Sequence, residues 1–213
     1  MQSMHHVAPP HFTPPQGHLG AHLLPDLSDF DIGTSSDSGS PELMIAPAVT
    51  YHQHRACGAL VRRMYSWRGY RLTPPRQQLG DPNHVTLGAW LDRDLVATLT
   101  ASRDSSAGLL ADTLYGHEMA ALRKPAKVIC EVTRLAVDLD CHDPELLKSL
   151  FRGAYQYARA VFGGTDVVIE VNPRHAGYYR RQLGFTQVGS LRTCPRVEAP
   201  AILLHRTLGN LHF

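Results

Sequence analysis

The stretch VICEVTRLAVD, residues 128–138, constrains the fold of this chain more than any other segment. Its β-branched and apolar residues are typical of a strand buried on both faces, as strands of a parallel pair usually are. Glu131 and Arg134 interrupt this run. Burying an ionised side chain costs roughly several kcal/mol unless the charge is paired or hydrogen-bonded. We therefore expect the two charged residues either to brace the strand as an ion pair or to have a chemical role.

The spacing of these two residues makes a further prediction. Side chains alternate between the faces of a regular strand, so Glu131 and Arg134 would point to opposite sides of the sheet. They can serve one site only if a bulge reorients the strand near Arg134, or if the arginine reaches round from the far face. We therefore predict an irregularity between Thr133 and Val137; a flat, fully paired strand would count against a shared role.

Apolar periodicity predicts the other elements around this strand. We expect a helix over residues 51–65, a hairpin of strands 84–91 and 94–102, and a helix over 111–123. After the central strand, Asp143 and Pro144 are suited to start a helix that Gly163 and Gly164 end. A strand over 165–171, a short helix ending at Gly184 and a strand over 201–208 complete the chain. This alternation predicts one α/β or α+β domain with a mixed sheet.

The first fifty residues differ in composition from the remainder. They contain seven of the 15 prolines, five of the 13 histidines, five acidic residues and no lysine or arginine. Such a segment buries too little apolar surface to offset the entropy of ordering. We expect residues 1–47 to form a disordered or loosely attached leader and residues 48–213 to form a single domain. The leader lacks the features of a secretory or mitochondrial targeting sequence.

Cysteine spacing, apolar runs and charge bear on whether the protein binds a metal, a membrane, nucleic acid or another protein. The four cysteines form no CxxC pair and no metal-ligand spacing, so we expect no metal site and free thiols in a reducing cytoplasm. No segment reaches the roughly 18 consecutive apolar residues of a membrane span. Residues 148–213 carry nine basic and three acidic residues, which would suit an acidic protein partner. Nucleic acid is not expected, because no recognised nucleic-acid motif accompanies this charge.

Two later segments, taken together with the central strand, resemble a known fold. Together with VICEVTRLAVD, TDVVIEV (165–171) and NPRHAGYYRRQLGF (172–185) resemble the core of the GNAT acyltransferase superfamily. The resemblance implies a mixed, mostly antiparallel central sheet flanked by helices, in which two parallel strands splay apart to admit a thioester arm. CEVTRLAV is similar to the Glu-x-x-Arg signature of LuxI-type acyl-homoserine-lactone synthases and FeeM-like long-chain N-acyl amino acid synthases. The FeeM-like family is the closer match, across most of residues 51–208.

The resemblance implies roles for particular residues. Glu131 corresponds to the base, and Arg134 to a binding or structural element. The substrate contacts that we expect are Leu135, Val137, Asn172, Tyr179 and, from the first helix, Arg62, Tyr65 and Trp67. Turn formation before Pro173 is an equal alternative for Asn172, and core packing is the favoured interpretation of Tyr178 and Tyr179. Glu170 is a minor candidate, because its place in the second strand also fits plain alternation.

The segment DLDCHDPEL, residues 138–146, bears on the acyl donor. In GNAT enzymes that use coenzyme A, a glycine-rich loop at this place holds the pyrophosphate with backbone N–H groups. Here the segment has no glycine and carries four carboxylates, which would repel a pyrophosphate. We therefore expect no tightly bound cofactor, and an acyl-phosphopantetheine thioester on acyl-carrier protein as the donor. The basic C-terminal region would suit the acidic surface of such a carrier.

The function expected from these features is that of an N-acyl amino acid synthase. It would transfer a medium or long fatty acyl group from acyl-carrier protein to the α-amine of an amino acid in the cytoplasm, with at most weak membrane contact through its lipid product. The alternatives are a coenzyme-A-dependent acetyltransferase acting on a small amine or protein, and an inactive module that binds acyl groups or proteins. An acyl-homoserine-lactone synthase is less favoured, since Thr100 stands where LuxI-type enzymes have an arginine.

Overall fold

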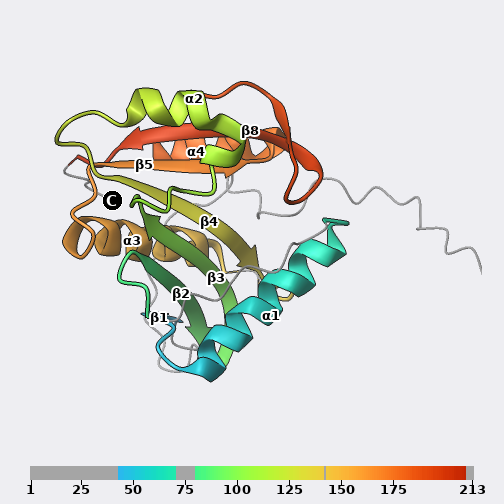
Figure 1. Ribbon diagram of the computed structural model, residues 1–213. Helices are drawn as coiled ribbons and strands as arrows, with labels where there is room; N and C mark the ends of the chain where they lie inside the picture. The colour runs from blue at the N-terminus through green and yellow to red at the C-terminus, as the bar shows by residue number, and fades with distance from the viewer. Residues whose placement is uncertain (1–42, 71–79, 142, 210–213) are drawn as a thin grey trace, which may run out of the picture.

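The computed structural model describes residues 43–70, 80–141 and 143–209 (Figure 1). Their elements are β1 (Leu43–Pro47), α1 (Tyr51–Trp67), β2 (His84–Leu91), β3 (Asp94–Arg103), α2 (Asp112–Leu122), β4 (Ile129–Val137), α3 (Pro144–Ala160), β5 (Asp166–Val171), the 3-10 turn η2 (Pro173–His175), α4 (Ala176–Leu183), β6 (Thr186–Gln187), β7 (Arg192–Cys194) and β8 (Ala199–Thr207). The helices and long strands lie where periodicity predicted them.

The strand β1 lies inside the segment that we expected to be a leader. It pairs in antiparallel fashion with β2, from Leu43 opposite Leu91 to Pro47 opposite Leu87. Ile45 packs against the main core. The folded part of the chain therefore begins earlier than residue 48. Residues 1–42 of the expected leader lie outside the described residues.

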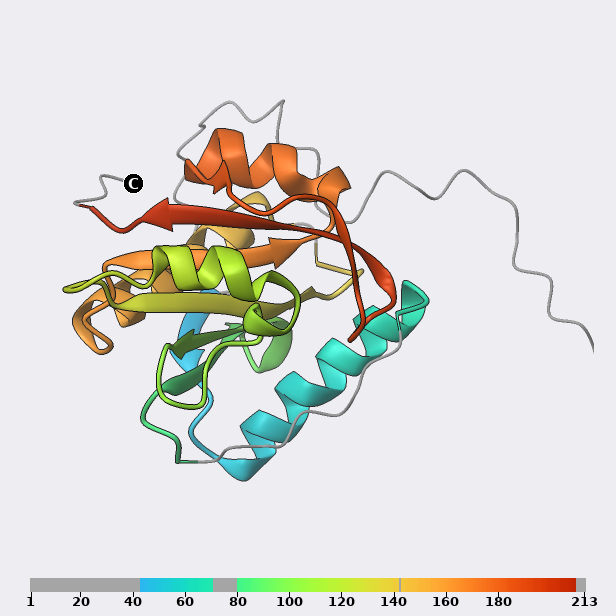
Figure 2. The ribbon, with the colours of Figure 1, turned by 45° about the horizontal axis from the view of Figure 1, so that its top comes forward.

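The strands form one mixed sheet in the order β1-β2-β3-β4-β5-β8-β6, with β7 paired to β8. The pair β4–β5 is parallel, because α3 carries the chain back between them, and the other pairs are antiparallel. The helices α1 and α2 cover one face of the sheet, and α3 and α4 cover the other (Figures 1 and 2). This arrangement confirms the expected α/β fold with a mostly antiparallel sheet flanked by helices.

The ends of the helices follow from local sequence. Thr50 and Gln53 form a capping box at α1, in which each side chain accepts a hydrogen bond from the other's backbone N–H. Asp143 caps α3 by accepting from the Glu145 N–H at 2.8 Å, and Pro144 occupies the first turn. Gly184 ends α4 with a φ of 64°, which glycine adopts without steric cost.

The strand β4 carries the predicted irregularity. Thr133 lies opposite Thr100 of β3, but Ala136 lies opposite Thr98, so Arg134 and Leu135 share the place of one residue on β3. Arg134 has a φ of 53°, in the left-handed region that disfavours residues with a side chain. This β-bulge reverses the alternation of the strand, so Thr133 and Ala136 both face the α1 side of the sheet. The prediction of a break between Thr133 and Val137 is confirmed.

Asp166, at the start of β5, is a buried carboxylate far from the bulge. Its carboxylate accepts hydrogen bonds from Lys127 Nζ at 2.8 Å and Thr165 Oγ1 at 2.7 Å, and it lies 2.8 Å from His205 Nε2. Burial raises the pKa of Asp166, but hydrogen bonds from Lys127, Thr165 and His205 lower it more, from 3.8 to about 2. The folded state thus favours the ionised form, which adds stability at neutral pH.

Replacing this carboxylate, in Asp166→Asn, is expected to lower the free energy of unfolding at pH 7 by about 2 kcal/mol. The difference in free energy of unfolding between wild type and variant should disappear between about pH 4 and pH 2. The stabilisation is present above the pKa of Asp166 in the unfolded chain, and it is lost as pH falls through the pKa of Asp166 in the folded protein. Urea unfolding across this range measures it. The exposed residue Asp94 provides a control, Asp94→Asn, and an Asp166→Asn deficit that is constant with pH would contradict the assignment.

Candidate active site

A cavity of 410 Å³ lies where β4 and β5 separate. Pairing between these parallel strands ends at Val132 and Ile169, although β4 continues to Val137 and β5 to Val171. The end of α1, the segment from η2 into α4 and the turn between β7 and β8 supply the remaining walls. The cavity thus occupies the gap that the resemblance predicted between two splayed strands.

The structure brings most of the predicted site residues together at this cavity. Those that line it are Glu131, Arg134, Leu135, Val137, Asn172, Tyr179 and Tyr65. Arg62 and Trp67 do not line it, and Trp67 is 48% exposed. The helix α1 reaches the cavity only with its last turn, where Tyr65 and Arg68 share a face. Trp67 is rotated about 200° from Tyr65, and Arg62 lies one turn further from the cavity.

Glu131 is almost completely buried, with 1% of its surface exposed. Its Oε2 accepts a hydrogen bond from the Leu110 N–H at 2.7 Å, and its Oε1 accepts one from the Ala111 N–H at 3.0 Å. Burial raises the pKa of Glu131 most, and Glu170 raises it too, whereas the Leu110 amide and Arg196 lower it; the resulting pKa is about 7, against 4.5 ordinarily. A carboxyl group with a pKa near neutrality is suited to general base catalysis.

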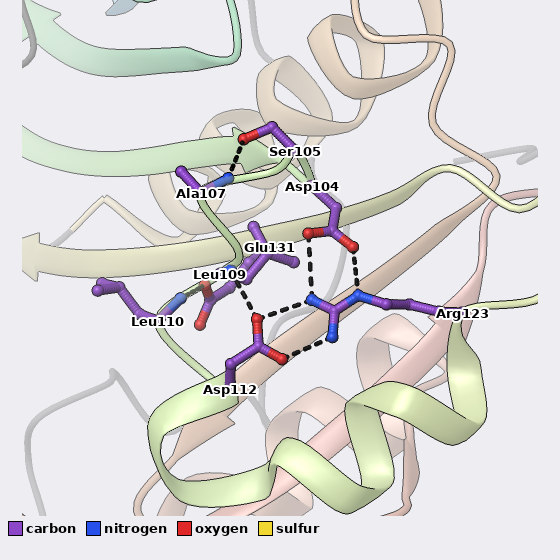
Figure 3. A network of polar contacts seen from close by, with 8 residues as sticks. All are labelled: Asp104, Ser105, Ala107, Leu109, Leu110, Asp112, Arg123 and Glu131. Carbon is purple, nitrogen blue, oxygen red and sulfur yellow. Dashed lines mark hydrogen bonds and ion pairs between the residues drawn. The ribbon is translucent and has the colours of Figure 1, made fainter.

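The loop that donates these two amides is held from its other side by Arg123 (Figure 3). The guanidinium of Arg123 binds Asp104 through Nε at 2.6 Å and Asp112 through Nη1 at 2.7 Å. The Leu109 N–H also donates to Asp112 Oδ2 at 2.7 Å. Residues 104–112 are therefore fixed at both ends, so their amides meet Glu131 in a defined geometry.

Arg134 and Arg68 provide positive charge within the cavity. Neither guanidinium makes a hydrogen bond or ion pair with any residue that the structure describes. Burial lowers the pKa of both arginines, while Tyr65 raises both and Glu131 raises that of Arg134. Two half-buried cations without a carboxylate partner among the described residues are suited to bind an anionic group. Sequence reasoning missed Arg68, which follows the last residue of α1.

The wall from β5 into α4 combines turn formation with contact to the cavity. Asn172 Oδ1 accepts from the Arg174 N–H at 3.2 Å, which starts η2, while Asn172 Nδ2 lies 3.5 Å from Tyr70 Oη. The turn interpretation of Asn172 is therefore confirmed, and its contact with substrate stays a prediction. His175 also lines the cavity, and its pKa is lowered to about 4 by burial, Arg174 and Arg68. Tyr179 packs edge to face on the core residue Phe151 at 5.8 Å and still borders the cavity.

Two carboxylates of the segment after β4 bind other groups of the protein. Asp138 forms an ion pair with Arg63, and Asp143 caps the first turn of α3. A carboxylate of the chain itself therefore caps the start of α3. Among the described residues, no three or more His, Cys, Asp or Glu side chains gather as metal ligands would. No helix in that part of the chain has the length and apolar character that crossing a membrane requires.

Comparisons with known proteins bear on the family of this chain. The sequence model of the family described as N-acyl amino acid synthase FeeM matches residues 56–207. Among solved structures, FeeM, an N-acyl amino acid synthase from uncultured soil microbes, superposes with a TM-score of 0.73 at 29% identity, over 79% of this chain and 93% of that chain. No curated protein matches the chain.

More distant structures share the fold alone. Escherichia coli ElaA superposes with a TM-score of 0.57 at 12% identity, over 78% of this chain and 99% of that chain. BjaI, a coenzyme-A-dependent acyl-homoserine lactone synthase solved with SAM and isopentyl-CoA, gives a TM-score of 0.57 at 16% identity, over 81% and 85% of the two chains. The match over residues 56–207 and the structural neighbours together show that the chain belongs to the FeeM family of N-acyl amino acid synthases and is a GNAT-fold N-acyltransferase.

Proposed function

We propose that the protein transfers a medium or long fatty acyl group from acyl-carrier protein to the α-amine of an amino acid. One observation carries this proposal: a buried carboxyl group with a pKa near 7 and a guanidinium without a carboxylate partner among the described residues face the same cavity between the parting strands. Glu131 provides the first and Arg134 the second. A base and an anion-binding group are what an amino acid acceptor requires.

The reaction follows from these two groups. The acceptor amine is mostly ammonium at neutral pH, so Glu131 takes a proton from it, directly or through a water. The freed amine attacks the thioester carbonyl and the C–N bond forms. The C–S bond then breaks, and the second proton of the attacking nitrogen passes to the sulfur, which leaves as the phosphopantetheine thiol. Arg134 holds the acceptor's carboxylate with two parallel hydrogen bonds. Backbone N–H groups beyond the last paired residues, Val132 and Ile169, stabilise the oxyanion.

The choice of donor rests on charge. The acidic segment 138–146 and the self-capped start of α3 disfavour the pyrophosphate of coenzyme A. The wall formed by η2 and α4 carries the exposed side chains of Arg174, Arg180 and Arg181 close to the cavity. These would attract an acidic carrier protein and speed its association. The free cysteines of the described residues fit the cytoplasm, where we place this reaction.

A comparison of donors tests the proposal. The purified protein is given the same acyl chain on acyl-carrier protein or on coenzyme A, with a mixture of amino acids, and N-acyl products are measured by mass spectrometry. We expect kcat/KM to be at least about tenfold higher for the carrier protein. The double change Arg180→Glu with Arg181→Glu should raise KM for the carrier-protein donor only, whereas Arg93→Glu, in the β2–β3 turn and outside the wall formed by η2 and α4, should not.

Each result has a defined meaning for this proposal. Equal or faster turnover of the coenzyme A thioester would overturn the choice of donor. The absence of any acylated amine with both donors, from protein that remains folded by circular dichroism, would overturn the acyltransferase function itself. Acylation of amines without a carboxylate at the same rate as amino acids would overturn the class of acceptor.

A further inference from the structure

Arg196, in the turn between β7 and β8, forms a bridge that no part of the proposed reaction yet uses. Its Nη2 forms an ion pair with Glu170 Oε2 at 2.7 Å, and its Nη1 donates to the Leu110 carbonyl at 2.9 Å. The Glu170 side chain is only 8% exposed and that of Arg196 27%. Both line the same cavity as Glu131.

The bridge leads directly to Glu131. The Leu110 residue whose carbonyl binds Arg196 also donates its own N–H to Glu131 Oε2 at 2.7 Å. Glu131 lies opposite Val168 of β5, so Glu170, two residues further along, points to the same face of the sheet. A continuous set of contacts thus joins Glu131, Leu110, Arg196 and Glu170, and links β4, the loop before α2, the β7–β8 turn and β5.

The loop has two anchors with different surroundings. Arg123 holds it through Asp104 and Asp112 (Figure 3). None of these three residues lines the cavity. Arg196 holds it at Leu110, on the cavity side. The charged groups near Glu131 are Arg134 from its own strand, Glu170 from β5 and Arg196 from the turn. Tyr115 of α2 donates its hydroxyl to the Ser190 and Ala201 carbonyls. Arg196 therefore neutralises the second carboxylate next to Glu131 while it fixes an amide on that residue.

We propose that Arg196 is a positioning residue of the acyl transfer: by joining Glu170 to the Leu110 carbonyl, it holds the Leu110 amide on Glu131 and balances the charge beside it. This inference rests on the proposed role of Glu131 as the base. The β7–β8 turn then belongs to the catalytic apparatus, in addition to forming a wall of the cavity with Val197 and Pro200.

The bridge makes an unusual prediction about pH, because its two members act on Glu131 in opposite directions. Arg196 lowers the pKa of Glu131 and Glu170 raises it. In Arg196→Gln the unpartnered Glu170 should move the rising limb of the kcat/KM profile to higher pH by about 1 unit. In Glu170→Gln the limb should move to lower pH by a similar amount, and in the double variant it should return close to the wild-type position.

The experiment measures kcat/KM for the acceptor between pH 5 and pH 9, together with the melting temperature, for the wild type and these three variants. Arg192 of the same hairpin offers a matched control, since it contacts the Leu114 carbonyl and Glu118 in the same manner without lining the cavity. Arg192→Gln should lower the melting temperature and leave the limb in place. Lysine keeps the positive charge of arginine but not its planar, forked set of donors. Arg196→Lys should therefore keep the rising limb near its wild-type pH, while its maximal kcat/KM stays below that of the wild type.

The outcomes separate this inference from the proposed function. Opposite shifts of the two single variants, cancelling in the double variant, support the inference. An unmoved limb in both Glu170→Gln and Arg196→Gln, or an equal loss of activity at every pH as in a purely structural brace, overturns it. If either result appears while Glu131→Gln is inactive, the inference alone fails; full activity of Glu131→Gln overturns the proposed base and the inference with it.

Discussion

Glu131→Gln is expected to lower kcat by about 100- to 10,000-fold, which is the usual effect of removing a general base. Glutamine has nearly the same shape as glutamate but cannot take the proton of the acceptor ammonium. Its NH₂ group also replaces one acceptor for the Leu110 and Ala111 amides, which should cost about 1–3 kcal/mol of stability. Steady-state kinetics at saturating substrate, with thermal unfolding of the same protein, measures both effects.

A matched control comes from Glu118 of α2, a carboxylate that pairs with Arg192 and does not line the cavity. Glu118→Gln should lose stability but keep its kcat. The wild-type rate should rise with pH up to about 7 and then level off, because only the carboxylate form of Glu131 accepts a proton. A Glu131→Gln enzyme with wild-type kcat, or a rate independent of pH between 5 and 8, would exclude Glu131 as the base.

The raised pKa of Glu131 also makes the stability of the protein depend on pH. Burial raises the pKa of Glu131 above its ordinary 4.5, so the folded protein binds more protons than the unfolded chain between about pH 4.5 and pH 7. The stability that Glu131 contributes is therefore fully present below its pKa in the unfolded chain. It is lost as pH rises through its pKa in the folded protein. The stability deficit of Glu131→Gln should accordingly shrink as pH increases, which urea unfolding at pH 5 and pH 8 would detect.

Arg134→Gly is expected to stabilise the protein and impair the enzyme at once. Arg134 has a φ of 53°, which glycine adopts freely, so the change should raise the free energy of unfolding by about 1 kcal/mol. Loss of the charge-assisted hydrogen bonds to the acceptor's carboxylate should raise KM for the amino acid by about 10- to 100-fold. Urea unfolding and acceptor kinetics measure the two effects. An amine without a carboxylate should be affected far less.

Ala126→Gly separates the two effects, because Ala126 has a φ of 64° in the exposed turn before β4 and is not part of the cavity. It should gain similar stability with no change in KM. Arg134→Lys should fall between wild type and glycine in KM, since lysine keeps the charge without the planar fork. An unchanged KM in Arg134→Gly would remove Arg134 from acceptor binding. Strain at a cavity-lining residue is what a functional constraint on the backbone produces.

Much of this protein is predictable from its sequence. Apolar periodicity predicts α1, α3 and the long strands, because burial of one face or both leaves a regular pattern along the chain. The bulge in β4 is also predictable, since plain alternation would place Glu131 and Arg134 on opposite faces. The expected boundary at residue 48 misplaces β1, because a five-residue edge strand is too short to show a period.

The sequence predicted only some of the residues that line the cavity. Sequence order indicates that the end of α1 lies near the site, but its rotation is set by the packing of Leu60, Val61 and Met64 against Ala136. That packing directs Tyr65 and Arg68 into the cavity instead of Arg62 and Trp67. A helical pattern identifies the buried face of a helix but not which residues at its edge meet a neighbouring cavity.

Sequence alone determined the elements, the family resemblance and the pair Glu131 and Arg134, because these depend on local patterns and on residues close together in the chain. Tertiary structure decided that Leu110, Glu170 and Arg196 meet around that pair. Arg196 and Leu110 are 86 positions apart, and nothing in either local segment signals the other. Their contact exists only because the β7–β8 turn and the loop before α2 reach the same face of the sheet, where β4 and β5 part.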